Sequence, residues 1–365
     1  LFEEDRLVAG TRAGIAQPLP AEALARLGGV GRDRLGWAQA RDAAAHRVLT
    51  TAETVTPGPW SNDRRPYLVE PMQRLALHDP CMNVIMIFGA QMGKTECGLN
   101  WLGYIIDHAP CAVMLVQPTG DDCKKFSKQR LYNLLQSSGL ADKVSEEKSR
   151  SGDNTLKEKM FPGGILVLVG ANAGSGVRGT PVRCLFADEV DGYPDRILGE
   201  GDPLELARKR LSASGDRAKE LLTSTPTMKH TSRITAAYEA SSQARWEMPC
   251  PHCGTMQELV WRSPEGEHRL FWEGDPGEDG PGFRVWYVCI NGCVIEEHHK
   301  GGMLAAGRWV HTFPERRARG YKLNALAAPL GATSWRTLVS EWIAANVRAK
   351  VGDTLGLQAF INTRL

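Results

Sequence analysis

The sequence lacks any long apolar segment and any large excess of one charge. No apolar run approaches the roughly 20 residues that a membrane-spanning helix requires. The start of the chain also lacks the basic-then-apolar pattern of a signal peptide. These absences predict a cytosolic protein without a membrane segment. The net charge of +2 neither requires nor excludes a nucleic-acid partner, because a basic groove can lie on a balanced surface.

Length and cysteine usage give further bounds. With 365 residues, of which 42% are hydrophobic, the chain is long enough for two or three domains with a buried core. Its first residue is Leu rather than Met, so we expect it to be a piece of a longer protein. Of the nine cysteines, four are paired, and the others lie singly in surroundings typical of small buried hydrophobes. These single cysteines are Cys81, Cys97, Cys111, Cys123 and Cys184.

The chain divides into four predicted parts. Residues 1–60 are rich in Ala and Arg and predict a helical N-terminal arm without strands. Residues 61–246 contain the apolar runs NVIMIF, AVMLVQ, GILVLV, RCLFAD and ELLTS, separated by amphipathic helical patterns. This alternation indicates an α/β fold with a central parallel sheet covered on both faces. Residues 247–297 predict a ribbon with paired cysteines, and residues 298–365 predict a helical lid or linker.

The stretch NVIMIFGAQMGKTECG, residues 83–98, predicts a strand, a glycine-bounded turn and a helix. The common phosphate-loop pattern, GxxxxGK followed by Ser or Thr, requires Gly where this sequence has Phe88, so the loop is one residue short. It keeps the backbone N–H groups, the helix N-terminus, a lysine and a hydroxyl that ATP and Mg²⁺ require. A strand-to-helix turn with an incidental lysine is the alternative. The predicted nucleotide-binding residues here are Gly89, Ala90, Gln91, Met92, Gly93, Lys94 and Thr95, with Thr95 also a ligand of Mg²⁺.

A second signal is the apolar run Cys184 to Ala187, which leads into Asp188 and Glu189. Two carboxylates at the end of an apolar strand are costly unless a cation or a substrate lies there. In a phosphate-loop enzyme, the first carboxylate belongs to the Mg²⁺ shell and the second orients and deprotonates the attacking water. We therefore assign Asp188 to the metal and Glu189 to general-base catalysis. For the two acids alone, an acidic helix N-terminus is the alternative.

The paired cysteines are Cys250 and Cys253 in CPHCG, and Cys289 and Cys293 in CINGC. Two such turns give a four-thiolate set suited to structural Zn²⁺, with no open position for water. Disulfides are the alternative, and they do not suit a cytosolic protein. The second pair has the spacing CxxxC, which leaves three histidines as substitute ligands: His252, His298 and His299.

These motifs in this order resemble the large terminase subunit of tailed bacteriophages, most closely its lambda-like GpA group. The resemblance rests on GAQMGKTE, GSGVRGTPVRCLFADEVD, LLTSTPT, the cysteine pairs and GYKLNALAAPLGATSW, and it covers about residues 60–365. It implies a RecA-like (ASCE) P-loop ATPase with an inserted zinc ribbon that uses ATP, Mg²⁺ and Zn²⁺ to translocate double-stranded DNA into a procapsid. It further implies a homo-oligomeric ring on the portal protein, a small terminase subunit as partner, a location in the host cytoplasm, and a nuclease domain beyond this chain.

The resemblance also implies roles for residues outside the loop. Ser224, Thr225 and Thr227 match a coupling motif that senses the γ-phosphate, with a strand-ending ST-turn as the alternative. The segment RPYLVEPMQ matches an adenine-recognition segment, in which Gln73 hydrogen-bonds the base and Tyr67 stacks near it. A proline-flanked surface loop is the alternative for that segment.

Many members of the family carry an arginine inside the phosphate loop, and this sequence has none between Gly89 and Lys94. The transition state still requires a cation, and an arginine finger contributes about 10³ to 10⁵ in rate. Arg178 is the leading choice, reaching the nucleotide of a neighbouring subunit, and Arg183 is the second. The alternative for Arg178 is a structural arginine or a DNA contact. Isolated subunits are therefore expected to hydrolyse ATP slowly.

Two other functional classes are compatible with parts of the sequence. An ATP-dependent helicase or remodeller with a zinc ribbon would need a second RecA-like domain, and the residues after STPT predict a ribbon and helices instead. A zinc-dependent DNA-binding scaffold would not need an intact nucleotide site, whereas Lys94, Thr95, Asp188 and Glu189 are all present. The sequence therefore favours the ATPase.

Overall fold

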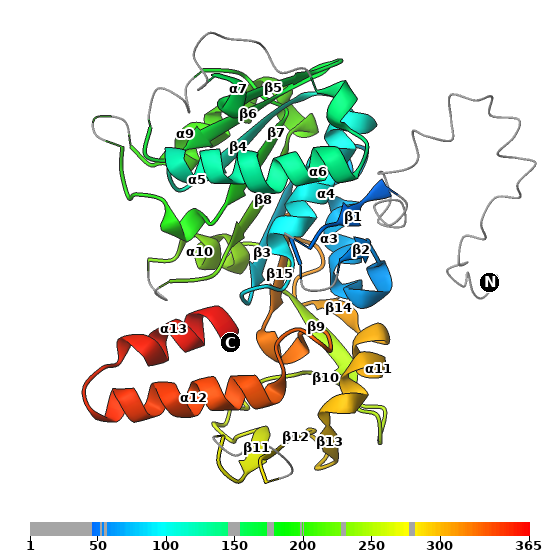
Figure 1. Ribbon diagram of the computed structural model, residues 1–365, viewed down its shortest axis with the longest axis vertical. Coiled ribbons are helices and arrows are strands. Elements are labelled where there is room, and N and C mark those ends of the chain that lie inside the picture. Colours follow the sequence, from blue (N-terminus) through cyan, green and yellow to red (C-terminus); the bar gives the residue numbers. More distant parts are fainter. Residues whose placement is uncertain are drawn as a thin grey trace, which may run out of the picture.

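The computed structural model describes residues 46–365, with gaps at residues 52, 55–56, 145–153, 174–178, 198, 200, 228–230 and 277–281. Residues 1–45, most of the predicted arm, lie outside the described residues. A long sheet with helices on both faces forms the body, and a pair of helices near the C-terminus lies beside it (Figure 1). No helix within the described residues is long and apolar enough to cross a membrane.

The central sheet has ten strands and is mixed. In spatial order they are β10 (Met256–Glu258), β9 (Ala244–Pro249), β15 (Arg319–Leu323), β3 (Asn83–Phe88), β8 (Lys219–Ser224), β7 (Cys184–Asp188), β4 (Ala112–Gln117), β6 (Gly164–Gly170) and β5 (Glu158–Phe161), with β14 (Arg308–His311) paired to β9. All five apolar runs are strands, as predicted, and they pair in parallel. The prediction of a purely parallel sheet is wrong at its edges, where β5, β10 and β14 pair antiparallel.

Helices cover both faces of this sheet, as the alternating pattern predicts. The α-helices are α3 (Val69–Arg74), α4 (Lys94–Asp107), α5 (Gly120–Lys125), α6 (Tyr132–Ser137), α7 (Asn154–Lys157), α9 (Pro203–Arg208), α10 (Arg233–Glu239), α11 (Lys300–Ala305), α12 (Trp335–Lys350) and α13 (Leu355–Arg364). A π-helical turn, η4 (Phe126–Leu131), joins α5 to α6. Short 3-10 helices are η2 (Asn62–Arg64), η3 (Pro66–Leu68), η5 (Ala141–Lys143), η6 (Val190–Gly192), η7 (Lys209–Arg217), η8 (Glu297–His299) and η9 (Ala325–Ala327).

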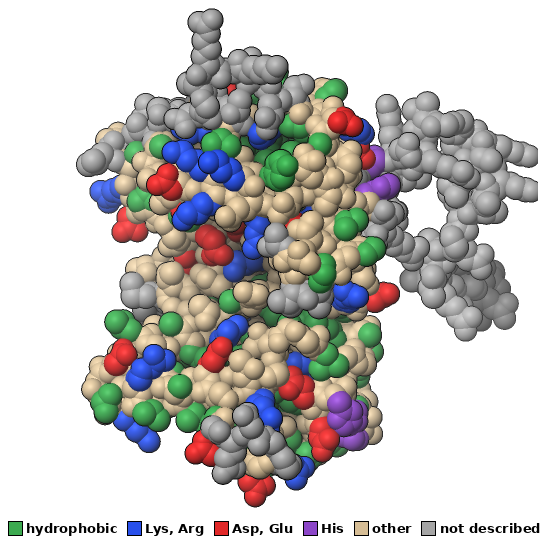
Figure 2. All heavy atoms as spheres, in the orientation of Figure 1, with side chains coloured by type: hydrophobic (Ala, Val, Ile, Leu, Met, Phe, Trp, Pro, Cys, Tyr) green, Lys and Arg blue, Asp and Glu red, His purple; other side chains and the backbone are tan. Residues whose placement is uncertain are grey.

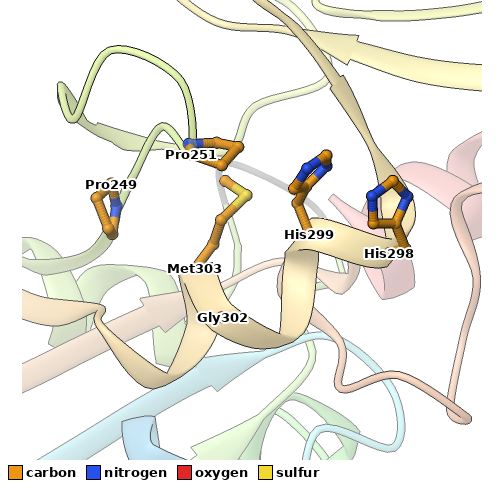
Figure 3. A pocket seen from close by; sticks show the side chains of 6 residues that line it. All are labelled: Pro249, Pro251, His298, His299, Gly302 and Met303. Carbon is orange, nitrogen blue, oxygen red and sulfur yellow. The ribbon is translucent and has the colours of Figure 1, made fainter.

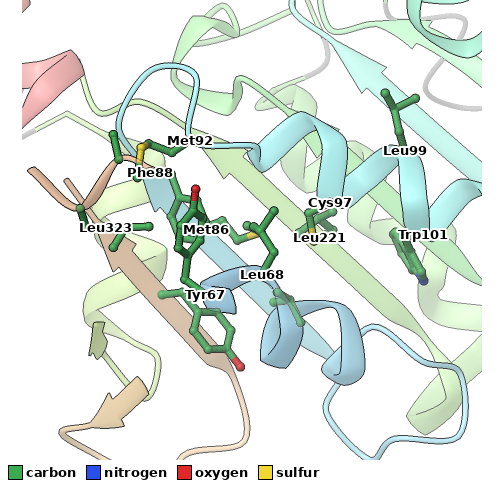
Figure 4. Packing of buried hydrophobic residues seen from close by; sticks show 14 of the residues in the cluster. Tyr67, Leu68, Met86, Phe88, Met92, Cys97, Leu99, Trp101, Leu221 and Leu323 are labelled. Carbon is green, nitrogen blue, oxygen red and sulfur yellow. The ribbon is translucent and has the colours of Figure 1, made fainter. Parts of the chain in front are cut away.

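Strand β3 shows how the two layers are built. Its alternate residues Val84, Met86 and Phe88 join the cluster that contains α4, α5 and α6, and Figure 4 shows Met86 and Phe88 within that packing. Ile85 and Ile87 join the opposite cluster, which contains α9 and α10. Because successive side chains of a strand point to opposite faces, a strand that is apolar throughout must be covered on both sides.

Two predicted parts contain strands where helices were expected. In the described end of the arm, β1 (Val48–Leu49) pairs with β2 (Gly58–Pro59). Between residues 298 and 365, β14 and β15 enter the central sheet, with β15 parallel to β3. Each of these strands is short. The partner of β15 lies far away in the sequence, so pairing with a distant strand overrides the helical composition of the residues around β15. A separate sheet is formed by β11 (Leu270–Glu273), β12 (Arg284–Val288) and β13 (Val294–Glu296).

The helix that follows the glycine loop packs very closely on the sheet at Gly98. A methyl group added at Gly98 would lie 2.1 Å from the ring of Phe186 in β7. Phe186 is fully buried, so the ring has little room to move aside. Glycine at this position therefore brings the start of α4 close to the strand that ends in the two acids.

We expect Gly98→Ala to destabilise the protein by about 1–3 kcal/mol, the usual cost of overpacking a core. Gly302→Ala is the matched control, because Gly302 is also helical but a methyl group there meets no atom within 4 Å. Alanine is the better helix former, so the control should lose no stability. Urea denaturation of both variants measures the difference, and equal midpoints would contradict the packing role of Gly98.

Candidate nucleotide-binding site

The glycine loop leaves β3 and turns sharply into α4. The Gly89 amide donates to the Leu323 carbonyl at 2.9 Å, and the Met92 amide donates to the Gly89 carbonyl at 3.3 Å. Gln91 and Gly93 have φ values of 64° and 88°, in the left-handed region. Gly93 is the N-cap of α4, and no side chain caps the first amides of the helix. The loop therefore ends at an uncapped helix N-terminus, which attracts phosphate.

Lys94 is the first residue of α4, and it forms an ion pair with Glu189, which follows strand β7. Its Nζ lies 3.1 Å from Glu189 Oε1, and the lysine side chain is 9% exposed while that of Glu189 is 37% exposed. Glu189 has φ 52°, a left-handed conformation that is uncommon for a residue with a side chain. The backbone turn after β7 thus aims this carboxylate at the lysine of the loop. The sequence predicted both residues for one site, and the structure brings them together.

Asp188 ends β7 and is 3% exposed. It accepts hydrogen bonds from Gln117 Nε2 at 3.2 Å and from the Thr223 hydroxyl. Burial raises the pKa of Asp188 and the neighbouring Glu189 raises it further, while the bonds from Thr223 and Gln117 oppose the shift. A buried carboxylate with a raised pKa is a group whose charged form a bound cation would stabilise.

The predicted coupling motif follows β8 and contacts the acids directly. The Ser224 hydroxyl and the Thr225 amide each lie 3.4 Å from Glu189 Oε2. The Thr227 amide donates to Asp191 Oδ2 at 3.0 Å. Hydroxyl and amide groups at the end of one strand therefore hold the carboxylates that follow the next strand. Whether this contact senses the γ-phosphate stays a prediction.

Helix α13 touches both the glycine loop and the coupling segment. The Ala90 amide donates to the Thr363 carbonyl at 2.8 Å, and Asn362 Nδ2 donates to the Thr227 carbonyl. A methyl group at Gly89 would lie 3.2 Å from the Thr363 carbonyl, so the helix approaches the loop closely. No local sequence pattern predicts this contact, because it joins segments more than 130 residues apart.

The predicted adenine-recognition residues have different outcomes. The Tyr67 side chain is fully buried and packs edge to face with Phe88 at 5.9 Å and with Trp246 at 6.1 Å between ring centroids (Figure 4). No face of its ring is open to a base, so the prediction that Tyr67 stacks on adenine is wrong for this structure. Gln73 is exposed in α3, and its contact with a base stays a prediction.

The two arginine-finger choices also differ. Arg178 lies outside the described residues, so its role stays a prediction. Arg183 precedes β7, at the opposite end of that strand from Asp188. It donates to the carbonyls of Arg217 at 3.2 Å and Leu77 at 3.4 Å. Arg183 therefore does not reach the acids of its own subunit.

The four paired cysteines meet at the tips of two hairpins. The hairpin of β9 and β10 carries Cys250 and Cys253, and the hairpin of β12 and β13 carries Cys289 and Cys293. Their Sγ atoms all lie within 4.8 Å of one another, and Cys253 and Cys289 are 4.0 Å apart. All four are free thiols, so disulfides are not formed here.

The turns around the thiols resemble metal knuckles. The amides of Asn291 and Cys293 donate to Cys289 Sγ at 3.3 Å and 3.2 Å. The Thr255 hydroxyl lies 3.4 Å from Cys253 Sγ, and hydrogen bonds with the side chain and backbone of Thr255 lower the pKa of that thiol to about 6. The pKa values of Cys250 and Cys293 are raised instead, Cys250 mainly by burial and Cys293 mainly by its bond with Cys289.

Among the described residues, no histidine belongs to this group of thiols. His298 and His299 instead line a neighbouring pocket with Pro249, Pro251 and Met303, as Figure 3 shows. His252 packs against His299, with ring centroids 5.2 Å apart. The structure therefore brings together the four predicted cysteines and leaves out the three histidines that the sequence left as substitutes.

A short loop that follows a buried strand, with its lysine opposite two carboxylates at the end of another strand, is the arrangement of P-loop nucleotide-binding proteins. The model of the family described as phage terminase large subunit gpA, ATPase domain, matches residues 54–309. The chain therefore belongs to this family.

Relatives agree with that assignment. The terminase large subunit of Enterobacteria phage P21 is 28% identical over 88% of this chain and 51% of its own length. The terminase large subunit of Escherichia phage lambda is 25% identical over 81% and 48%, so the chain spans about half the length of the curated relatives it matches. The large terminase ATPase domain of Thermus phage P74-26 is 12% identical, with a TM-score of 0.41 over 80% of this chain and 90% of that chain. A likeness of that size adds nothing to the assignment.

We expect Glu189→Gln to keep ATP binding and to lose hydrolysis by at least about a hundredfold, because a general base contributes on that scale. Lys94→Ala should instead weaken ATP binding, since it removes the phosphate cation. Glu315→Gln is the control, because Glu315 is exposed and away from the site. Steady-state hydrolysis and binding of a fluorescent ATP analogue separate the effects, and near-normal turnover by Glu189→Gln would assign the base elsewhere.

Proposed function

We propose that this chain is the ATP-hydrolysing motor part of a phage terminase large subunit and that it drives double-stranded DNA into a procapsid. The observation that carries the proposal is the 3.1 Å contact between Lys94, at the uncapped start of α4, and Glu189, beside the buried Asp188. The glycine loop, the Lys94 ammonium, the buried Asp188 and the partly exposed Glu189 together supply the groups that ATP hydrolysis requires.

The residues present fit ATP and Mg²⁺. The backbone N–H groups at the start of α4 and the Lys94 ammonium would hold the phosphates. Asp188 and the Thr95 hydroxyl would hold Mg²⁺, which supplies charge stabilisation at the phosphates. The strand order β3-β8-β7 places one strand between the loop strand and the acid strand, which supports the RecA-like (ASCE) type.

ATP binding would release Glu189 for catalysis. In the ion pair, the Lys94 ammonium holds the carboxylate that the reaction needs as a base. A γ-phosphate at the loop would compete for Lys94, because phosphate carries more charge than one carboxylate. Glu189 would then be free to accept a proton from water. The ion pair would therefore keep the Glu189 carboxylate from acting as a base until a nucleotide binds.

The partners of the whole protein remain part of the proposal. They are double-stranded DNA, the portal protein, a small terminase subunit and further copies of the chain in a ring, in the host cytoplasm. Among the described residues on the face drawn in Figure 2, acidic and basic side chains are interspersed, so these residues form no broad basic surface there. Arg178 of a neighbouring subunit stays the proposed trans cation in such a ring, and a nuclease domain is proposed for the longer protein.

The helicase alternative has less support. After β8, the described residues form the two hairpins with the cysteines, strand β11 beside one of them, two more strands of the central sheet and the helices α10 to α13. A second RecA-like sheet is not among them. The motor proposal therefore accounts for the described residues with one nucleotide site per chain.

The test is Mg²⁺-dependent ATP hydrolysis by the purified chain, with and without double-stranded DNA and procapsids that carry the portal. We expect hydrolysis that DNA stimulates and that Lys94→Ala abolishes. DNA binding without any hydrolysis would favour the scaffold alternative, and ATP-driven unwinding of duplexes would favour the helicase.

The cysteine cluster is proposed to bind one structural Zn²⁺. The spread of the four Sγ atoms, within 4.8 Å, suits a tetrahedral ion with Zn–S bonds of about 2.3 Å. The two tips also touch where Asn291 Nδ2 donates to the Thr255 hydroxyl at 2.8 Å. Four thiolates leave no position for a reacting water. The zinc would therefore hold the second hairpin against the end of the central sheet.

We expect the protein to contain about one zinc per chain, and Cys289→Ser to lose that zinc and to loosen the hairpins, because ligand loss removes folding free energy. Cys123→Ala is the control, since Cys123 is buried outside the cluster. Elemental analysis and hydrogen exchange give the two readouts. Parent protein that carries no zinc after purification without chelators would contradict the site.

A further inference from the structure

Arg65 lies against the glycine loop although it comes from a separate segment of the chain. It stands between η2 and η3, just before Tyr67. A methyl group at Gly93 would lie 3.4 Å from Arg65 Cδ and 3.6 Å from its Nε. Gly93 immediately precedes Lys94 and caps α4, so this arginine reaches the phosphate-binding end of the loop.

Arg65 has no acidic partner within the described part of the chain. Its Nε is buried without a hydrogen-bond partner, its guanidinium lies 5.9 Å from the ring centre of Trp60, and its charge acts on the buried Tyr67 hydroxyl, which is no anion. Two other cations of this region do have acidic partners. Lys94 pairs with Glu189 at 3.1 Å, and Arg74 pairs with Asp79 at 3.2 Å. A partly buried guanidinium without an anion is costly, unless an anionic ligand completes it.

The charge of Arg65 lies next to a loop that has no arginine of its own. The loop residues Ala90, Gln91 and Met92 include no arginine, and Met92 turns its side chain into the core. Transfer of the γ-phosphoryl group develops charge that a second cation besides lysine stabilises. Arg65 lies beside Gly93, and a turn of its outer side-chain bonds away from Trp60 would let the planar guanidinium meet phosphate oxygens in a forked hydrogen bond.

We propose that Arg65 is a catalytic residue that binds the β- and γ-phosphates of ATP within its own subunit and replaces the arginine that the loop lacks. The inference rests on the proposed ATPase function. It adds a cation in cis, which is present before any ring forms, and Arg178 of a neighbour would act in addition to it.

The test compares Arg65→Ala with Arg64→Ala, its exposed neighbour in η2. We expect Arg65→Ala to lower kcat by about a thousandfold or more, on the scale of a lost arginine finger, and to bind ADP within about twofold of the parent protein. Arg65→Lys should recover part of the rate, and guanidinium ion at millimolar concentration should partly rescue Arg65→Ala. Arg64→Ala should behave as the parent.

The structural alternative gives a different pattern. If Arg65 only supports the fold, Arg65→Ala lowers the melting temperature, guanidinium rescues nothing, and the loss of rate follows the fraction of unfolded protein. If it contacts the base, affinity for ADP and ATP falls equally and kcat is kept. Either result overturns the proposal. A parent protein without any hydrolysis would instead contradict the proposed function itself.

Mixing variants separates action in cis from action in trans. If Arg65 acts in cis, an Arg65→Ala subunit has a defect in its own nucleotide site, and so has a Glu189→Gln subunit. A mixture of the two then contains no intact site. Mixed assemblies should then stay as inactive as either variant alone. Recovery of hydrolysis in the mixture would show that Glu189→Gln subunits donate Arg65 to their neighbours, and the assignment in cis would be wrong.

Discussion

The ion pair between Lys94 and Glu189 is the contact on which the rest of the site depends. It joins the first turn of α4 to the turn after β7, so it connects the two sheet elements that carry the loop and the acids. Ser224 and Thr225 then hold the other carboxylate oxygen of Glu189. Water screens the almost fully buried Lys94 ammonium little, whereas the Glu189 carboxylate stays partly exposed, so a bound phosphate can take its place beside the lysine.

The cysteine hairpins are built into the same framework rather than appended to it. Strand β9 pairs with β15 in the parallel part of the sheet, and its other end forms the hairpin with β10 that carries Cys250 and Cys253. Strand β15 in turn lies beside β3, which leads into the glycine loop. A metal at the thiols would therefore stiffen a hairpin that is two strands away from the phosphate site.

The sequence predicted those parts whose signal is local. The run before Gly89 and the run before Asp188 are continuous and apolar, so their strands, the loop and the two acids follow from residue order alone. The stacking role of Tyr67 follows from the family resemblance alone, and no local pattern shows that its ring packs on Phe88 and Trp246 from distant strands. Arg65 and the carbonyl of Thr363 left no local pattern, since only the folded chain brings them to the loop.

The contact between α13 and the glycine loop gives this helix a mechanical role. The Thr363 carbonyl accepts a hydrogen bond from the Ala90 amide of the glycine loop, and Asn362 donates one to the Thr227 carbonyl of the coupling segment. Adjacent residues of one helix therefore bind two loops of the site. A shift of α13 would therefore carry both loops in the same direction. A helix of ten residues is stiff on this length scale, so displacement at one end reaches the other nearly undiminished.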